Sequence, residues 1–158
     1  MHMPDLAALG ELLIDFTPSG VSGQGNPLFE CNPGGAPANV LAALVRLGGT
    51  GAFIGKVGSD TFGRFLSDTL KKNGIDSKGL RFDKKVNTTL AFVHLSSTGD
   101  RSFSFYRNPG ADMMLSCDEV DRNIIRDAEA FHFGSVSMTH EPSRTATLES
   151  ARMAREMG

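Results

Sequence analysis

The sequence predicts an α/β fold built on a doubly wound, Rossmann-like parallel sheet, with a small second β-sheet beside it. Residues 6–16, 52–57 and 130–134 are runs of mainly apolar residues, which is typical of strands covered on both faces. Helical patterning follows these runs, as in a β-α-β-α succession. Residues 88–95 and 101–108 instead alternate between two faces, which predicts a β-hairpin outside the parallel sheet.

The first half of the chain supplies most of the predicted parallel sheet. We expect a strand at 6–16, loops with one short strand (28–31) over 17–33, a helix at 38–47, a strand at 52–57 and a helix at 61–73. Asp60 precedes the second helix as an N-cap. Gly48 and Gly74 follow the two helices, where glycine tolerates the left-handed conformation that ends them.

The second half begins with the hairpin, whose turn is predicted at Thr98–Asp100. Ser116 and Glu119 have the spacing of a capping box, which predicts a helix from there to about Asp127. A strand at 130–134 and a final helix up to Met157 follow. Because a doubly wound domain that ends on a helix usually has a strand still to come, we expect the C-terminal half of the fold to be missing.

Composition limits the classes of function. The chain has 158 residues, 40% of them hydrophobic and 22% charged, as expected for a compact domain. Its net charge is −2, so neither a nucleic acid nor a membrane is expected as the main partner. Cys31 and Cys117 are far apart, which predicts neither a disulfide nor a metal site. No signal peptide is visible, so a cytoplasmic location is expected.

The segment at 32–39 is the strongest candidate binding motif. Gly34 and Gly35 precede a predicted helix, so the backbone there can approach a ligand closely, and free helix N–H groups can bind ligand oxygens. Asn39 in the first turn offers both a donor and an acceptor to a hydroxyl group. The alternative is a loop-to-helix turn shaped by backbone demands alone.

Two further candidates come from the strands. Asp15 ends the first predicted strand, where ligands bind in open α/β sheets, and its carboxylate could accept two hydroxyl protons. The alternative is a solvent-facing or capping aspartate. Phe103, Phe105 and Arg107 share one face of the hairpin and could cover a small ligand. That face could equally be a protein interface.

The sequence carries no recognisable catalytic, nucleotide-binding or metal-binding motif. The segment around Gly55-Lys56 lacks the first glycine and the Ser or Thr of a phosphate-binding P-loop. Gly20, Gly23 and Gly25 have the wrong order of spacing for a dinucleotide fingerprint. The histidines show no ligand spacing. We therefore predict no catalytic residue and no metal ligand in this chain.

Taken together, the motifs resemble those of the ribokinase-like (PfkB) carbohydrate kinases, and most closely the fructokinase branch. The resemblance covers nearly the whole chain and rests on Gly10–Phe16, Pro33–Asn39, Gly55–Gly63, Phe103–Met113 and Phe131–Ser135. It implies an α/β base domain at 1–15, 33–85 and 110–158, and a β-sheet lid at 16–32 and 86–109. The lid would close over a small sugar and form a homodimer. The implied sugar-binding residues are Asp15, Gly34, Gly35, Asn39, Phe92, Phe105 and Arg107.

The resemblance also implies a reaction. It is the ATP-dependent phosphorylation of a small sugar, D-fructose at a primary hydroxyl, with Mg²⁺ and a monovalent cation as further expected cofactors. Family kinases carry the base, the anion hole and the ATP pocket around a Gly-Ala-Gly-Asp motif, which these 158 residues lack. We therefore expect the chain alone to be inactive. The alternatives are a 2-keto-3-deoxygluconate kinase, since Arg107 suits an acidic sugar, a ribokinase, a nucleoside kinase, or a non-catalytic sugar-binding or dimerising fragment.

Overall fold

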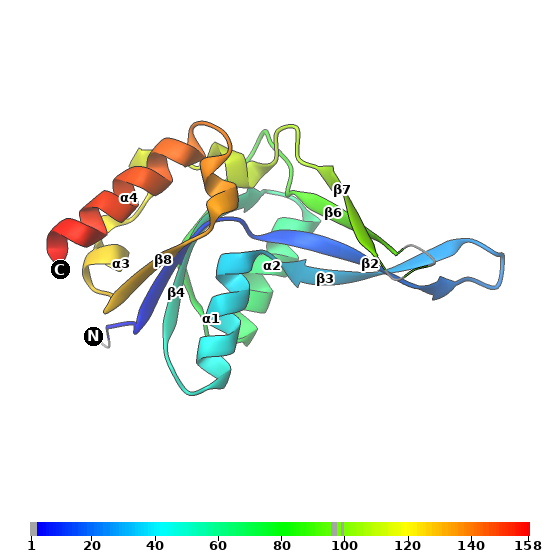
Figure 1. The fold of residues 1–158 in the computed structure, drawn as a ribbon, viewed down its shortest axis with the longest axis horizontal. Coiled ribbons are helices and arrows are strands. Elements are labelled where there is room, and N and C mark those ends of the chain that lie inside the picture. Colours follow the sequence, from blue (N-terminus) through cyan, green and yellow to red (C-terminus); the bar gives the residue numbers. More distant parts are fainter. Residues whose placement is uncertain (1–2, 96–97, 99) are drawn as a thin grey trace.

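The computed structural model describes residues 3–95, 98 and 100–158, which form two four-stranded sheets (Figure 1). The first sheet is parallel throughout, with the strand order β5-β4-β1-β8. Its strands are β1 (Leu6–Leu9), β4 (Gly51–Gly58), β5 (Asp76–Asp83) and β8 (Ala130–Phe133). Within the described residues, β8 forms one edge of this sheet.

Helices cover both faces of the first sheet, as predicted for a doubly wound fold. The helices on one face are α1 (Ala36–Arg46) and α2 (Thr61–Lys72); those on the other are α3 (Arg122–Arg126) and α4 (Ser143–Met157) (Figure 1). Neighbouring residues of β4 point to opposite faces, so Phe53 joins the core under α1 and α2 while Ile54 joins the core under α4. Both side chains are fully buried.

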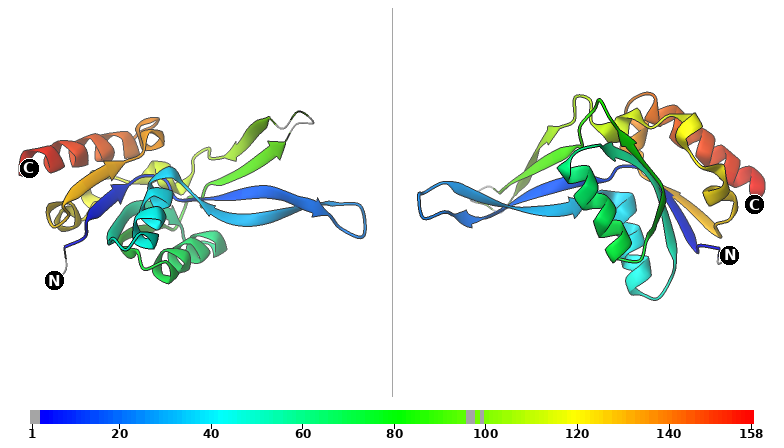
Figure 2. Two further views of the ribbon diagram at one scale, coloured as in Figure 1. Left: turned by 60° about the horizontal axis from the view of Figure 1, so that its bottom comes forward. Right: turned by 180° about the vertical axis from the view of Figure 1, so that it is seen from behind.

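The second sheet has the order β3-β2-β6-β7 and projects away from the first (Figure 2). Its strands are β2 (Leu13–Val21), β3 (Pro27–Gly34), β6 (Leu90–Leu95) and β7 (Arg101–Tyr106). β2 and β3 form a long antiparallel ribbon, and β2 pairs in parallel with β6. The predicted hairpin is therefore present as β6 and β7; Gly99 of its predicted turn lies outside the described residues.

The predicted single strand at 6–16 is wrong, because the chain changes sheets within it. β1 ends at Leu9, Gly10 takes a φ of 155°, and β2 begins at Leu13 in the second sheet. A side chain at Gly10 would overlap Pro37 of α1 and crowd Gly134, so only glycine fits this crossing. Asp15 consequently lies on a strand of the second sheet and not at the end of the first core strand.

Three other elements differ from the expectation. The predicted loops at 17–33 are mostly strand, because β2 continues to Val21 and β3 spans Pro27–Gly34. β5 was not expected, because its half-exposed edge position leaves little apolar patterning. The predicted helix from Ser116 is divided: the capping box opens only the 3-10 turn η2 (Cys117–Glu119), and Asp121 then caps α3. Two further 3-10 turns are η1 (Ala111–Met114) and η3 (Ser135–Met138).

Candidate functional site

A cavity of about 510 Å³ lies where the two sheets meet. β2, the start of α1, the end of the β6–β7 hairpin and η3 all contribute to it. It is lined by Glu11, Leu13, Asp15, Gly35, Ala36, Asn39, Phe105, Arg107 and Val136. The cavity thus brings together five of the seven predicted site residues, from segments far apart in the sequence.

Asp15 is positioned by the register of the second sheet. It pairs with Asn32 on β3 and with Ala91 on β6, and Ala91 pairs in turn with Phe105 on β7. Residues paired across strands point to the same face, so Asp15 and Phe105 face the cavity together. Burial raises the pKa of the Asp15 carboxyl above its ordinary value. This carboxyl can accept hydroxyl protons from a ligand when it is ionised.

The two glycines leave space for this arrangement in different ways. Gly34 does not line the cavity, but a side chain there would overlap the Asp15 carboxylate. Gly35 takes a φ of 117°, and a side chain there would overlap the carbonyl oxygen of Glu11. Gly35 also precedes α1, and its carbonyl accepts a hydrogen bond from the Asn39 amide at 3.0 Å. The exposed Asn39 side chain lines the cavity one turn into the helix.

Glu11 lines the cavity but was not predicted from the sequence. Its side chain is only 4% exposed, and Oε1 accepts a hydrogen bond from the Ala36 amide at 2.9 Å. This bond satisfies a free N–H at the start of α1, which the N-cap Gly35 cannot do without a side chain. Among the described residues, Oε2 has no partner. A carboxyl inside an otherwise apolar run was the signal that could have identified it.

Arg107 lies just beyond the end of β7, and its guanidinium is held by an ion pair. Nε and Nη2 lie 2.8 Å and 2.7 Å from Oδ2 of Asp112. Nη1 lies 3.3 Å from Oγ1 of Thr139, and Nη2 lies 3.4 Å from the carbonyl of Val136. The side chain therefore joins the hairpin to η3 at the rim of the cavity. Phe103 and Phe105 stack beside each other on the hairpin with 5.9 Å between ring centroids.

The expectation that Phe92 lines the cavity is wrong. Phe92 follows Ala91 on β6, so it points to the opposite face of the second sheet. There it stacks on Phe16 at 4.8 Å and contacts Phe29 and Tyr106 edge-on, each at 5.5 Å. This aromatic cluster thus packs on the face of the sheet opposite to Asp15.

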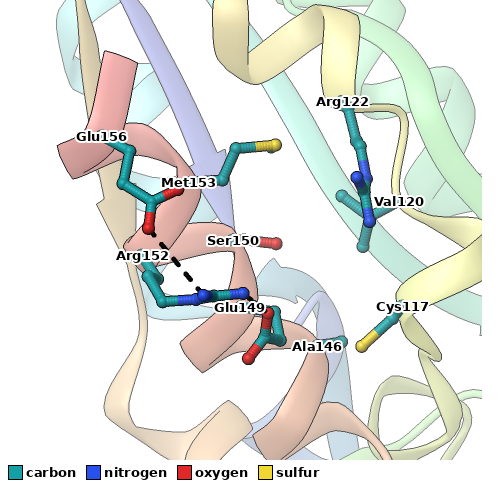
Figure 3. Close-up of a pocket in the computed structure, with 9 residues that line it drawn as sticks. All are labelled: Cys117, Val120, Arg122, Ala146, Glu149, Ser150, Arg152, Met153 and Glu156. Carbon is teal, nitrogen blue, oxygen red and sulfur yellow. Dashed lines mark hydrogen bonds and ion pairs between the residues drawn. The ribbon is translucent and has the colours of Figure 1, made fainter. Parts of the chain in front are cut away.

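A second, smaller cavity lies between α4 and the η2–α3 segment (Figure 3). Its volume is about 110 Å³, and it contains none of the predicted residues. Arg152 lines this cavity and is paired with Glu149 at 2.5 Å and with Glu156 at 3.8 Å. Because these charges satisfy one another on the surface of one helix, we assign the functional site to the cavity that contains Asp15.

The lining of the Asp15 cavity fits neither a nucleotide phosphate nor a metal ion. Its one cationic side chain, Arg107, is paired with Asp112, and its other ionisable groups are the two carboxyl groups of Glu11 and Asp15. No group of three or more His, Cys, Asp or Glu side chains in the part that the structure describes could hold a metal ion. No helix there is long and apolar enough to cross a membrane.

The chain belongs to the pfkB family of carbohydrate kinases, whose family model matches residues 3–158. It is 51% identical over 155 residues to probable fructokinase-3 of Arabidopsis thaliana, covering 97% of this chain and 45% of that protein. A fructokinase of Solanum tuberosum is also 51% identical, with 49% of its length covered.

Solved structures agree with this assignment. The fructokinase of Xylella fastidiosa superposes with a TM-score of 0.91 at 39% identity, covering 98% of this chain and 48% of that one. The fructokinase of Vibrio cholerae, solved with fructose, ADP and calcium bound, gives a TM-score of 0.83 at 33% identity and covers 100% and 49%. The chain spans about half the length of the relatives that it matches. The predicted family and fold class are confirmed.

Proposed function

We propose that this chain forms the sugar-binding half of an ATP-dependent fructokinase that phosphorylates D-fructose at a primary hydroxyl. The observation that carries the proposal is the cavity in which Asp15, the Gly35 backbone and Asn39 meet. Its lining combines these polar groups with the apolar side chains of Leu13, Phe105 and Val136. A sugar presents the same two kinds of surface, hydroxyl groups and apolar ring carbons.

Each residue has a defined part in this proposal. The Asp15 carboxylate accepts protons from two neighbouring hydroxyls, which fixes the orientation of the sugar. The Asn39 amide both donates to and accepts from another hydroxyl, at the start of α1. Gly34 and Gly35 leave the space in which these groups can approach the ring. Phe105 covers the ring from the second sheet and limits the access of water.

Phosphoryl transfer needs groups that these residues do not supply. It depends on positioning and on stabilising the charge of the transferring phosphate. Fructokinases solved with ATP or with fructose and ADP support ATP as the phosphoryl donor. Since the described residues fit neither the nucleotide nor Mg²⁺, we derive no step through them. We expect no ADP release from the 158-residue chain alone.

Assembly and location belong to the same proposal. Phe103, Phe105 and Tyr106 of the second sheet are 51%, 59% and 67% exposed. Exposed aromatic residues at this density favour a protein interface, so we propose a homodimer formed through the second sheet. A cytoplasmic location and a monovalent-cation requirement are further parts of the proposal.

The test compares sugars on the purified chain. We expect D-fructose to raise the unfolding temperature, and ribose, 2-keto-3-deoxygluconate and adenosine to raise it less. Asp15→Asn should weaken fructose binding by about tenfold or more, the effect of losing hydrogen bonds to a charged acceptor. Asp68→Asn is the matched control, because Asp68 lies on the surface of α2 with its side chain 78% exposed.

Three outcomes would contradict the proposal. Stabilisation by another sugar in preference to fructose would change the substrate. Fructose binding that survives Asp15→Asn would place the sugar elsewhere. ADP release by this chain with fructose and ATP would show that the transfer machinery lies within these 158 residues. Fructose binding without turnover is the expected result, and it equally fits the alternative of a non-catalytic sugar-binding fragment.

A further inference from the structure

We infer that Asp112 sets the charge of the sugar cavity: it holds Arg107 in place and neutralises it, so that the cavity prefers uncharged sugars to sugar acids. The inference rests on the proposed function for the identity of the site. Asp112 does not touch the cavity itself, so it acts through Arg107 as a positioning residue.

The ion pair is nearly closed off from solvent. The side chain of Arg107 is 12% exposed and that of Asp112 is 1% exposed. Two guanidinium nitrogens share Oδ2 of Asp112, at 2.8 Å and 2.7 Å. At this burial the screening by water is weak, so the carboxylate compensates most of the guanidinium charge.

Asp112 is fixed independently of Arg107. Its second oxygen, Oδ1, accepts a hydrogen bond from the Thr89 hydroxyl at 2.5 Å, and Thr89 is only 1% exposed. The amide of Ala111 donates a hydrogen bond to the carbonyl of Asn87 at 2.9 Å, which anchors η1 to the segment that leads into β6. A side chain at Gly110 would overlap the Thr89 hydroxyl and crowd Oδ1, so glycine preserves this contact. Both carboxylate oxygens are therefore engaged.

The pairing leaves little of the guanidinium for a ligand. Its bonds to Asp112, Thr139 and Val136 use four of the five N–H groups, so at most one remains for a sugar oxygen. The other ionisable side chains that line the cavity are Glu11 and Asp15, both carboxyl groups. A sugar acid would thus meet no uncompensated cation there, whereas a neutral hydroxyl can still accept the remaining N–H.

The test removes the compensation and measures selectivity. We would determine the affinities for D-fructose and 2-keto-3-deoxygluconate in the full chain and in Asp112→Asn, Arg107→Gln/Asp112→Asn and Asp68→Asn. Asp112→Asn should raise the affinity for the sugar acid relative to fructose by about tenfold or more, since it frees a charged donor. The double variant should not show this gain, because the gain requires the guanidinium. A purely structural role for Asp112 would weaken both sugars alike.

Acetate, a simple carboxylate, separates this inference from the proposed function. Acetate should stabilise Asp112→Asn more than an equal concentration of chloride does, without any sugar present, and should not stabilise the wild type or the double variant. If fructose fails to bind the wild type but acetate behaves in this way, the proposed function fails and the charge compensation stands. If fructose binds but Asp112→Asn gains affinity for neither acetate nor the sugar acid, the inference is overturned.

A wild-type measurement covers the case in which Asp112→Asn does not fold. Fructose titrations of the wild type in about 100 mM acetate and in about 100 mM chloride have equal ionic strength, so they differ only in the carboxylate. We expect the same affinity in both. Weaker fructose binding in acetate alone would reveal an uncompensated guanidinium and would overturn the inference.

Discussion

Replacing Lys56 by methionine should destabilise the chain, because Lys56 is the buried cation of a cluster with the half-buried carboxylates of Asp83 and Glu119. It lies on β4 and is 9% exposed. Its Nζ is 2.8 Å from Oε1 of Glu119, 3.2 Å from Oδ2 of Asp83 and 3.1 Å from the carbonyl of Met114. Burial opposes its charged form, but hydrogen bonds and charges from Glu119 and Asp83 outweigh this and raise the pKa of Lys56.

The size of the effect follows from what the substitution leaves behind. Methionine fills a similar space but strands two carboxylates without a counter-charge. Breaking a buried pair in this way costs about 3–5 kcal/mol, and the partial exposure of the two carboxylates, 13% and 26%, places the expected loss toward the lower end. For a chain of this length, about 2–4 °C is lost per kcal/mol, so the unfolding midpoint should fall by about 6–20 °C.

Thermal unfolding followed by circular dichroism measures this, with Lys71→Met as the control. Lys71 pairs with Asp68 at 3.6 Å on the surface of α2, where the two side chains are 64% and 78% exposed. Its loss should change stability by about 1 kcal/mol at most. The triple variant Lys56→Met/Asp83→Asn/Glu119→Gln should recover much of the loss, because it removes the stranded charges. A midpoint for Lys56→Met no lower than that of the control would refute the reasoning.

The pH dependence supplies a second check. In the cluster, the pKa values of Asp83 and Glu119 are lowered, since bonds to backbone amides, to Ser116 and to Lys56 outweigh the effect of burial. Their stabilisation is present above the unfolded pKa values near 4 and is lost as the pH falls through the lowered ones. The raised pKa of Lys56 gives stabilisation below about 10.5 that is lost as the pH rises through the raised value. The difference between wild type and Lys56→Met should therefore be largest between about pH 5 and pH 10 and should shrink in acid.

Three further predictions concern the site and its supports. Gly35→Ala should lower the free energy of unfolding by about 2–5 kcal/mol, because the added methyl group would overlap the Glu11 carbonyl at a backbone position with positive φ. Denaturant unfolding measures this change, and a decrease below about 1 kcal/mol would contradict the prediction. The affinity for fructose should fall as the pH is lowered, and this fall should begin at a higher pH than it would for an aspartate with an ordinary pKa. The reason is that burial raises the pKa of Asp15, and its protonated form accepts fewer hydroxyl protons. Calorimetric titration from pH 4 to 8 tests this, and an unchanged pH dependence of the affinity in Asp15→Asn would refute it. Asp60→Ala should lower the free energy of unfolding by about 2–4 kcal/mol, because the Asp60 side chain caps α2 and also accepts hydrogen bonds from the amide and the hydroxyl of Thr88, each at 2.8 Å. A decrease no greater than the loss of an ordinary N-cap, about 1 kcal/mol, would show that the bonds to Thr88 contribute nothing.

The buried elements of the first sheet could be predicted from the sequence because both of their faces are covered. The predicted strand at 52–57 lies within β4, and the predicted strand at 130–134 covers β8 and one residue beyond it. The helix predicted at 61–73 matches α2 to within one residue. β5 could not be predicted in this way, because an edge strand needs few apolar residues. The sheet change after Leu9 was also hidden, since both sheets bury this part of the chain and the apolar pattern continues across Gly10.

The candidate site was predictable in its parts but not in its assembly. Alternation along β6 predicts two faces, but it does not tell which face meets the first sheet. That choice is set by the register between Asp15, Ala91 and Phe105, which excludes Phe92. Glu11 was missed for a similar reason, since its function as the cap of α1 depends on a contact across 25 residues of sequence.

The segment from Arg107 to Glu119 links the stability of the fold to the selectivity of the site. At one end, Asp112 holds Arg107 at the rim of the cavity. Two residues further on, the carbonyl of Met114 accepts a hydrogen bond from Lys56 of β4, and Glu119 completes the Lys56 cluster. Thr89, just before β6, thus holds Asp112 directly, and Lys56 holds the same segment two residues away. If this is correct, Lys56→Met should loosen Arg107 as well as lower the unfolding midpoint, and its affinity for fructose should fall even well below the temperature at which it unfolds. An unchanged fructose affinity in folded Lys56→Met would show that Thr89 alone is enough to hold Asp112.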